Sequence, residues 1–212
     1  MDEPFYAYYL SETGLSHPMR NEVIASQSQN WQHVMTTINA PLQGRNSLLY
    51  VKHMTQHMLP EIDLSQLLDH KHCFLIREPR LVIASFSEKF ENITADATGF
   101  RQQLDLFNYF IEQGLSVSVV EGEDIQKSPE TLLTKLCESC DISFDRKMLS
   151  WPPGKRPEDG VWGAHWYNAV ETSTGFAPYV EKEVQLTRNQ EKLAKELEPY
   201  YLEMKTHKIT LS

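Results

Sequence analysis

Short apolar runs alternate with longer amphipathic stretches along this chain, and this alternation constrains the fold more than any other feature. The apolar runs lie within residues 47–52, 73–77 and 115–120. A short continuous apolar run is typical of a strand that is buried on both faces. The stretches between the runs repeat apolar residues at helical spacing. Parallel strands joined by helices form a sheet covered on both faces, so the sequence predicts an α/β fold in three layers.

Proline and glycine mark the expected helix ends. The missing N–H of a proline costs nothing in the first turn of a helix, and three prolines suit that position: Pro18, Pro79 and Pro129. The helix that begins at Pro18 is expected to continue to Ile38, and Gly114 is expected to end another helix in a left-handed conformation. A charged helical tail is expected over residues 178–205, with a break at Pro199.

The charge balance restricts the partners of the chain. It has 212 residues, and 20 Lys and Arg against 29 Asp and Glu give a net charge of −9. Affinity for a nucleic acid backbone comes mainly from Lys and Arg, so we expect no nucleic acid partner. A small anionic ligand in one local basic pocket stays compatible with this balance. Eighteen apolar residues in a row occur nowhere, so we expect no membrane span.

Three cysteines, too few for a disulfide framework, occur in the chain: Cys73, Cys137 and Cys140. No basic segment precedes an apolar core near Met1, which argues against a secretory signal. Together these features predict a cytoplasmic protein. Cys137 and Cys140 form a single C-x-x-C, whose helical spacing with neighbouring leucines favours burial in a helix over a redox pair or half a metal site. We therefore expect no metal.

The segment from Phe74 to Ser85 is the strongest candidate for a binding site. Arg77 is expected at the carboxyl end of a strand, where parallel sheets bind ligands, and Pro79 at a helix start whose free amides favour an anion. A phosphate there would bind the guanidinium of Arg77 and the hydroxyl of Ser85, about two turns into the helix. In the alternative interpretation, Arg77 pairs with a surface carboxylate and Ser85 has no binding role.

This order of an arginine, a proline two residues later and a serine eight residues after the arginine resembles the 3′-phosphate-binding segment of a known family. The family is the sulfotransferases that use 3′-phosphoadenosine 5′-phosphosulfate as sulfuryl donor. Residues 119–125, followed by Ser128 and Pro129, resemble the strand, Glu-Asp turn and helix that come next in these enzymes. Gly122 stands where many members have an aromatic residue that contacts the adenine.

Residues 151–167 and 173–176 resemble the C-terminal segment of a bacterial and plant subgroup that is often labelled after branched-chain aminotransferases. The resemblance covers residues 2–176 and implies one sulfotransferase-like domain over residues 1–212, related to the P-loop NTPase folds, with a charged tail over 177–212. It also implies a set of nucleotide-binding residues: Arg77, Arg80, Ser85, Lys155 and Arg156.

The aromatic and basic residues of the C-terminal segment have two interpretations each. Trp162 or Trp166 would offer the nucleotide a stacking face, or would anchor the loop by burial. Lys155 and Arg156 would fold over a nucleotide phosphate, or would form a solvated basic pair.

Sulfuryl transfer requires a base for the acceptor and a cation for the charge that grows on the leaving oxygen. The resemblance implies Lys52 as that cation and Glu3, in a Glu-Pro element, as the first candidate for the base. His53 is the second candidate, because Met54 occupies the usual histidine position and either His53 or His57 would have to substitute. The alternative for each of these residues is a polar surface role.

The family binds the phosphosulfate with a strand, a Gly/Ser/Thr-rich turn and a helix, and its order would place this unit before Asp2. We therefore expect a sulfotransferase domain that is N-terminally incomplete, with exposed strand edges that favour a homo-oligomer. The implied function is transfer of a sulfuryl group from 3′-phosphoadenosine 5′-phosphosulfate to a hydroxyl or amine acceptor. The alternative is a non-catalytic nucleotide-binding or interaction module. Variable loops form the acceptor pockets of such folds, so the motifs do not identify the acceptor.

Overall fold

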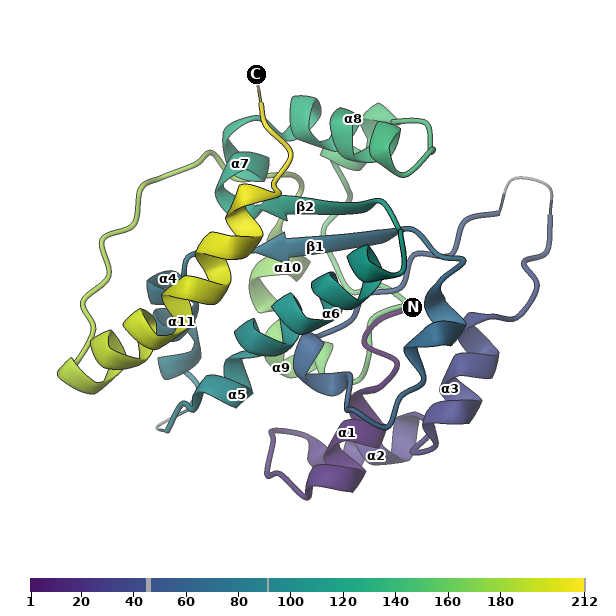
Figure 1. Ribbon diagram of the computed structural model, residues 1–212, viewed down its shortest axis with the longest axis horizontal. Coiled ribbons are helices and arrows are strands. Elements are labelled where there is room, and N and C mark those ends of the chain that lie inside the picture. The colour runs from purple at the N-terminus through teal and green to yellow at the C-terminus, as the bar shows by residue number, and fades with distance from the viewer. Residues whose placement is uncertain (45–46, 91, 212) are drawn as a thin grey trace. The chain divides into compact units, whose positions relative to one another are not determined.

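The computed structural model describes residues 1–44, 47–90 and 92–211, and the chain divides into two compact units (Figure 1). The first unit holds residues 1–67 and 152–173. The second unit holds residues 68–151 and 174–212. Both units are therefore assembled from segments that are distant in the sequence.

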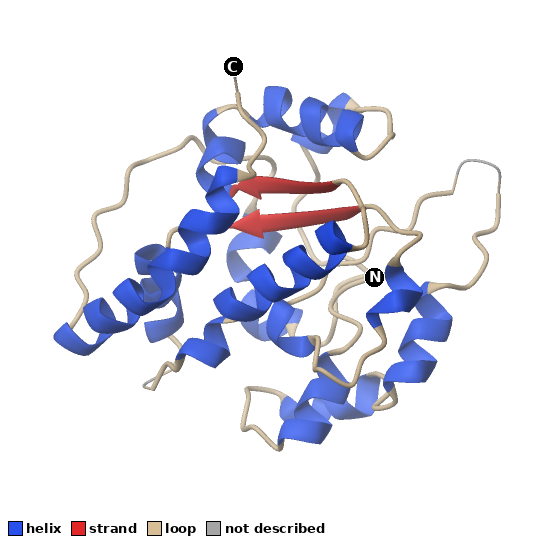
Figure 2. Ribbon diagram, viewed as in Figure 1, coloured by secondary structure: helices blue, strands red, loops and turns tan. Residues whose placement is uncertain are grey.

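The first unit consists of short helices and loops (Figure 2). Its helices are α1 (Tyr6–Thr13), α2 (Arg20–Ser26), α3 (Trp31–Ile38), η1 (Thr55–His57), η2 (Leu64–Leu67), α9 (Gly163–Trp166) and α10 (Asn168–Thr172). Helix α1 forms the centre of the unit, because its side chains pack with Val23 of α2 and with Trp162. Helix α1 was not predicted, because its first turn is almost entirely aromatic and has no clear helical periodicity.

The single helix expected from Pro18 to Ile38 is wrong, since residues 27–30 separate α2 from α3. Asn30 begins α3 as its N-cap, and its side chain accepts a hydrogen bond of 2.9 Å from the backbone N–H of His33. Asparagine is a preferred N-cap because it satisfies an amide that the helix leaves free. The apolar pattern continues across this boundary, which is why periodicity alone did not reveal it.

The second unit contains two parallel strands, β1 (His72–Ile76) and β2 (Val117–Glu121), in register from His72 opposite Val117 to Ile76 opposite Glu121. Its helices are α4 (Pro79–Ser87), α5 (Ala95–Thr98), α6 (Phe100–Glu112), α7 (Gly122–Lys127), α8 (Pro129–Ser139), η3 (Arg146–Leu149) and α11 (Arg188–Thr206). Helices α6, α7, α8 and α11 all contact β2. The parallel pairing of strands separated by helices is confirmed.

Local signals predicted several element boundaries correctly. Pro79 and Pro129 are the first residues of α4 and α8, and Gly114 follows α6 with a φ of 80°. That backbone conformation is open to glycine and costly for other residues. These boundaries depend on the backbone geometry of one residue and its neighbours, which the sequence reports directly.

The structure differs from the prediction at two of the three expected strands. Residues 47–52 form no strand, and Leu48 and Tyr50 are 67% and 75% exposed. Strand β1 is not buried on both faces, because Leu75 is 58% exposed and Cys73 is exposed as well. A run of apolar residues does not specify which neighbours cover it, so burial on both faces was an overestimate. The described part of the sheet therefore has two strands instead of the predicted three.

The C-terminal tail is helical over a shorter range than predicted. Helix α11 begins at Arg188, after a capping box in which the side chains of Thr187 and Gln190 bind each other's backbone amides. Pro199 lies inside α11 and does not end it. Helix α11 packs on α4, α6 and both strands, and this packing offsets the hydrogen bond that the proline lacks.

Cys137 is buried in α8, where its sulfur lies 3.8 Å from the sulfur of Met148, and Cys140 follows the helix end. This placement agrees with the helical interpretation of the C-x-x-C. Within residues 1–44, 47–90 and 92–211, no three His, Cys, Asp or Glu side chains gather as metal ligands would. No helix among the same residues has the length and hydropathy of a bilayer span.

Candidate active site

Backbone pairing in the first unit places Glu3 next to Lys52. The N–H of Glu3 donates to the carbonyl of Lys52 at 2.9 Å, and the N–H of Lys52 donates to the carbonyl of Met1 at 3.0 Å. The side chain of Gln27 supports this arrangement by donating to the carbonyl of Glu3 at 3.2 Å. Glu3 has a φ of 40°, in the left-handed region that residues other than glycine seldom adopt.

Four side chains form what we call the Glu3–Lys52 site: Asp2, Glu3, Lys52 and Tyr167. Nζ of Lys52 donates to Oε1 of Glu3 at 2.6 Å, to the hydroxyl of Tyr167 at 2.7 Å and to Oδ1 of Asp2 at 3.2 Å. The hydroxyl of Tyr167 in turn donates to Oδ2 of Asp2 at 2.8 Å. All three protons of the ammonium group are used, and two of them bind carboxylates.

Burial affects the pKa values of Glu3 and Lys52 differently. Glu3 is only 7% exposed, and burial raises the pKa of its carboxyl, an effect that the attraction of Lys52 only partly cancels. For Lys52, burial lowers the pKa, but Glu3 and Tyr167 outweigh it and raise the pKa above its usual value. The lysine side chain is less buried than the glutamate, so its charged form loses less hydration. Lys52 therefore stays charged, and Glu3 is the group poised to accept a proton.

Two histidines lie near this site. His53, the second predicted base, stacks on Phe5 with ring centroids 5.6 Å apart. His57 is buried between aromatic rings, and its Nδ1 lies 3.8 Å from Oε2 of Glu3. Burial, reinforced by nearby positive groups, lowers the pKa of His57 well below its ordinary value, so this imidazole is neutral at pH 7.

The loop over residues 152–162 reaches the site through Gly160 and Trp162. The N–H of Gly160 donates to Oδ2 of Asp2 at 3.3 Å, and a Cβ at position 160 would lie 2.1 Å from the ring of Trp162. Trp162 is fully buried against Tyr6, and its Nε1 donates to the hydroxyl of Tyr167 at 3.3 Å. Trp162 therefore anchors the loop by burial and offers no exposed face for stacking on a nucleotide.

Other predicted residues of the first unit lie at its surface. Lys155 and Arg156 are exposed, and the N–H of Arg156 donates to the carboxylate of Asp159 at 3.1 Å. A pocket of about 520 Å³ opens beside Asp2, and its lining combines apolar residues, namely Met1, Leu49, Val161 and Trp162, with polar ones, namely Ser26, Gln27, Glu158 and Asp159. A small molecule has room in this pocket.

In the second unit, Arg77 follows the last residue of β1, and only Glu78 separates it from the start of α4. It is half-buried and forms no ion pair with any residue that the structure describes. Pro79, the first residue of α4, has no N–H, and the N–H groups of Leu81 and Val82 donate to the carbonyl of Glu78 at 3.1 Å. In the first turn this leaves the N–H of Arg80 to face an anion. We call the group formed by Arg77 and the first turn of α4 the Arg77 corner.

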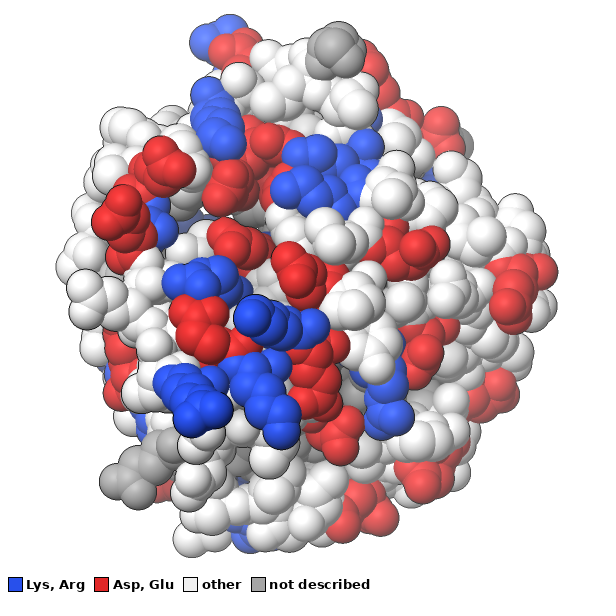
Figure 3. Space-filling model, turned by 60° about the vertical axis from the view of Figure 1, so that its left-hand side comes forward, with Lys and Arg blue, Asp and Glu red and all other residues white. Residues whose placement is uncertain are grey.

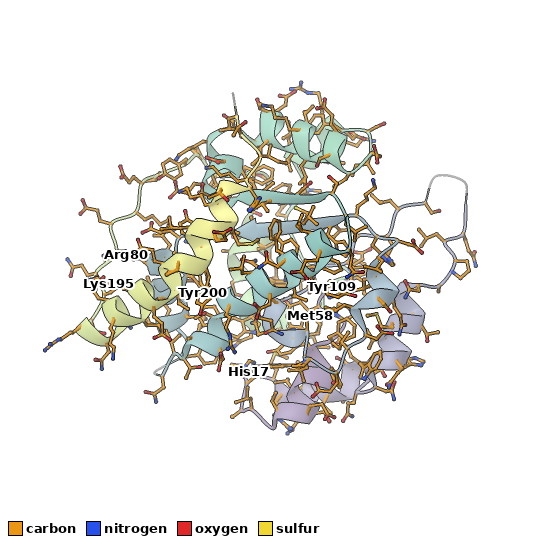
Figure 4. All side chains as sticks on the ribbon, in the orientation of Figure 1. His17, Met58, Arg80, Tyr109, Lys195 and Tyr200 are labelled. Atoms are coloured by element: carbon orange, nitrogen blue, oxygen red, sulfur yellow. The ribbon has the colours of Figure 1, made fainter. Side chains whose placement is uncertain are left out.

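Arg80 and Ser85 have different surroundings from Arg77. Both Nη atoms of Arg80 are engaged, because Nη1 binds the carboxylate of Glu191 at 2.6 Å and Nη2 donates to the carbonyl of Val184 at 3.1 Å. Figure 4 shows Arg80 beside α11. Ser85 is exposed on α4. The structure thus leaves Arg77 available for a ligand, whereas Arg80 already links α4 to α11.

A buried carboxylate lies at the carboxyl end of β2. Glu121 accepts from the hydroxyl of Tyr201 and from Lys208, and Lys205 lies 3.0 Å from it. Burial raises the pKa of Glu121, but these donors outweigh burial and lower it to about 2. Glu123 and Asp124, expected in a turn after the strand, lie in helix α7, and Asp124 accepts from Lys208 at 2.6 Å. This cluster attaches the C-terminal residues to the sheet.

Sequence reasoning placed Glu3 and Lys52 in one site, and the structure brings them into direct contact. It missed Asp2 and Tyr167, and it considered His57 only as a replacement base. Tyr167 lies 115 positions from Lys52 in the sequence, so no local spacing connects the two. A weak signal was present, because Asp2 and Tyr167 both lie in segments that resembled the family.

The chain is similar to a solved structure and to two plant proteins. A solved structure, the "Sulfotransferase Domain from the Curacin Biosynthetic Pathway", is similar at a TM-score of 0.48 and 18% identity, over 90% of this chain and 77% of that one. "Branched-chain-amino-acid aminotransferase-like protein 1" of Arabidopsis thaliana is 33% identical over 177 residues, 84% of this chain and 32% of the relative. "Branched-chain-amino-acid aminotransferase-like protein 2" of the same plant is 29% identical over 178 residues, 84% of this chain and 31% of the relative.

The chain thus spans about a third of the length of these curated relatives. The family model described as "Sulfotransferase domain" matches residues 1–208, past the position near 176 where the sequence resemblance ended. Because this match covers nearly the whole chain, the protein belongs to the sulfotransferase domain family.

Proposed function

We propose that this chain transfers a sulfuryl group from 3′-phosphoadenosine 5′-phosphosulfate to a hydroxyl or amine acceptor. The observation that carries the proposal is the contact of 2.6 Å between the buried carboxylate of Glu3 and the ammonium group of Lys52, in a chain of the sulfotransferase domain family. Glu3 acts as the base that takes the acceptor proton. Its raised pKa supports this role, because a base is most effective when its pKa approaches the working pH.

Lys52 supplies the positive charge for the oxygen that leaves the sulfur. Its three protons are already bound, so one of its bonds must open to admit that oxygen. The bond to Asp2, at 3.2 Å, is the longest of the three and is the one that we expect to yield. The bonds to Glu3 and Tyr167 would then keep the ammonium group oriented.

The Arg77 corner is proposed to bind the 3′-phosphate of the nucleotide. Its support is the half-buried guanidinium directly after a strand end, close to the start of α4. The pocket beside Asp2 is proposed to admit the acceptor. Three further residues are proposed to contact the nucleotide, and all of them are exposed and so accessible to it: Ser85, Lys155 and Arg156.

Calorimetric titration with 3′-phosphoadenosine 5′-phosphate and a transfer assay with labelled donor test the proposal together. We expect binding by the intact chain, and transfer to at least one hydroxyl or amine acceptor. Glu3→Gln should abolish transfer and preserve binding, whereas Glu22→Gln, at an exposed position of α2, should change neither. Absence of binding heat would contradict the proposal. Binding without transfer to any acceptor is the result expected of the alternative, a nucleotide-binding module without turnover.

A further inference from the structure

A buried histidine with no role in the proposed transfer lies beside the carboxylate of Glu3. His57 is 3% exposed and lies between two tyrosines of α1. Its ring stacks on Tyr6 with centroids 4.4 Å apart and an interplanar angle of 11°, and it lies 4.8 Å from the ring of Tyr9. These contacts fix the plane of the imidazole and direct Nδ1 toward Glu3.

Nδ1 of His57 is buried and has no hydrogen-bond partner among the described residues. A buried polar atom without a partner costs roughly 1–3 kcal/mol, so a well-packed protein seldom retains one without a compensating role. The nearest charged atom is Oε2 of Glu3, at 3.8 Å. This distance exceeds an ordinary hydrogen bond by about 1 Å.

A neutral imidazole carries one proton, and a proton on Nδ1 would donate to Oε2 at hydrogen-bond distance. The gap of 3.8 Å therefore indicates the tautomer with its proton on Nε2, in which Nδ1 is an unprotonated acceptor. The other oxygen of Glu3, Oε1, is held by Lys52, which leaves Oε2 facing the imidazole. The lone pairs of a carboxylate oxygen and an unprotonated imidazole nitrogen repel each other, and a proton on either atom would close the gap. Burial raises the pKa of Glu3 and lowers that of His57, so the carboxyl is the better place for the proton.

We infer that His57 is a positioning residue for Glu3, whose Nδ1 accepts a hydrogen bond from Oε2 of Glu3 when that carboxyl takes up a proton. The inference rests on the proposed role of Glu3 as the base. In the transfer step, the O–H or N–H bond of the acceptor breaks and its proton moves to Oε2. The freed electron pair forms the bond to sulfur, and the bond from sulfur to the bridging oxygen breaks with its electrons on the departing phosphate. The proton is then held between Oε2 and Nδ1, and the imidazole stays neutral.

Other groups around His57 also influence its titration. The charged and titratable groups that face it are Glu3, Tyr6, Tyr9, His17, Lys52 and His53. The hydroxyl of Tyr6 lies 3.0 Å from Nδ1 of His17, which Figure 4 labels. A second proton in this cluster would lie close to Lys52, so the positive charge of that lysine further disfavours a charged His57.

The test measures the pKa of Glu3 in the intact chain by carbon-13 NMR of its carboxyl group. His57→Phe keeps an aromatic ring between the two tyrosines and removes the acceptor nitrogen. We expect this variant to lower the pKa of Glu3 by about one unit, because the protonated form loses a hydrogen bond. His57→Asn, which offers a polar atom near the position of Nδ1, should restore most of that shift. A pKa of Glu3 that is unchanged or higher in His57→Phe would overturn the inference.

A second measurement covers the case in which His57→Phe does not fold. In the unchanged chain, the nitrogen-15 signal of Nδ1 should move together with the carboxyl signal of Glu3 as the pH changes. In Glu3→Gln, the amide donates to Nδ1 at every pH, so this signal should stay at its hydrogen-bonded position. An Nδ1 signal that does not follow the titration of Glu3 in the unchanged chain would also overturn the inference. Neither measurement requires the sulfuryl donor or its acceptor molecule. The outcome is therefore independent of whether the chain binds nucleotide or transfers sulfuryl groups.

Discussion

The protonation of Glu3 depends on two opposing effects at one carboxyl group. Burial removes hydration from the charged form and raises the pKa, whereas the ammonium group of Lys52, 2.6 Å away, stabilises the charge and lowers it. Burial outweighs the attraction, although Asp2 shares the same lysine. At the scale of a residue, the pKa of Glu3 is therefore set by the balance between lost hydration and the charge of Lys52.

Lys52→Met tests this balance. The variant keeps the apolar part of the lysine and removes its charge, so the pKa of Glu3 should rise further. A carboxyl whose folded pKa lies above its unfolded pKa destabilises the folded state once the pH exceeds the unfolded value. The variant should therefore lose stability as the pH rises above about 4.5, by roughly 1.4 kcal/mol for each added unit of pKa shift. Urea denaturation at several pH values measures this loss.

Lys52→Arg is the matched control, because it retains a positive charge next to Glu3. It should keep the unfolding free energy much closer to that of the unchanged chain. A pH dependence in Lys52→Met that matches Lys52→Arg would show that the lysine charge has no influence on Glu3.

Helix α4 carries two arginines three positions apart around its start, and their surroundings differ. Arg77 precedes the helix and forms no ion pair in the described part of the chain, whereas Arg80 binds Glu191 of α11. Both arginines were predicted from the sequence to bind the nucleotide. At the scale of an element, one arginine is available for a ligand and the other holds two helices together.

Substitution of each arginine should separate these roles. Arg77→Ala should weaken binding of 3′-phosphoadenosine 5′-phosphate about tenfold to a hundredfold, the range expected for a lost charge-assisted hydrogen bond. Its melting temperature should change little. Arg80→Ala should cost up to about 1 kcal/mol of stability, since its ion pair is partly exposed, and should affect binding less. Calorimetry measures both quantities, and equal losses of binding in the two variants would contradict this assignment.

The carboxylate at the end of β2 gives the second unit an acid-sensitive contact. Glu121 has a pKa of about 2 in the folded chain, below its ordinary value of 4.5. A lowered folded pKa contributes stability above the unfolded value, and this stability is lost as the pH falls from about 4.5 to about 2. The full shift corresponds to roughly 3 kcal/mol, an upper bound because Lys205 is partly exposed.

Glu121→Gln should remove this acid dependence. The variant is expected to be less stable at pH 7, because the two lysines lose their charged partner, and its unfolding free energy should change less between pH 4.5 and pH 2. Glu112→Gln, at the exposed end of α6, serves as the control. Equal acid sensitivity in Glu121→Gln and the unchanged chain would refute the role of this contact.

The whole molecule shows which features a sequence reveals by itself. Helix starts at Pro79 and Pro129 were correct, because a cap depends on adjacent residues. The strand expected over residues 47–52 was wrong, because burial depends on what covers a segment. The contact between Lys52 and Tyr167 depends on the path of the chain over 115 positions, which no local pattern records. The cytoplasmic location stays a prediction.

Charge is also distributed differently from what a net value of −9 suggests. Figure 3, in which the left-hand side of Figure 1 comes forward, shows Lys and Arg side chains interleaved with Asp and Glu on that face. Interleaved charges cancel at short range, so this face offers no continuous basic surface to a polyanion. The basic groups that matter for a small anion are therefore local, as at Arg77.

Self-association is expected from the edge of the sheet. Among the described residues β1 pairs only with β2, and Leu75 on this strand is 58% exposed. An open strand edge with an exposed apolar residue favours pairing with another chain. Leu75→Lys should shift sedimentation toward the monomer, whereas Ile111→Lys, at an exposed position of α6, should have a smaller effect. A monomer at all concentrations in the unchanged chain would contradict this prediction.

The left-handed backbone conformation of Glu3 affects how the protein could be stabilised. Its φ of 40° costs a residue with a side chain roughly 1 kcal/mol or more, whereas glycine adopts such a conformation freely. A protein engineered for thermal stability alone would therefore replace Glu3 with glycine, and it would lose the carboxylate as a result. The fold gives up stability at this position in exchange for an acidic group there, so stabilising substitutions at position 3 should trade directly against chemistry.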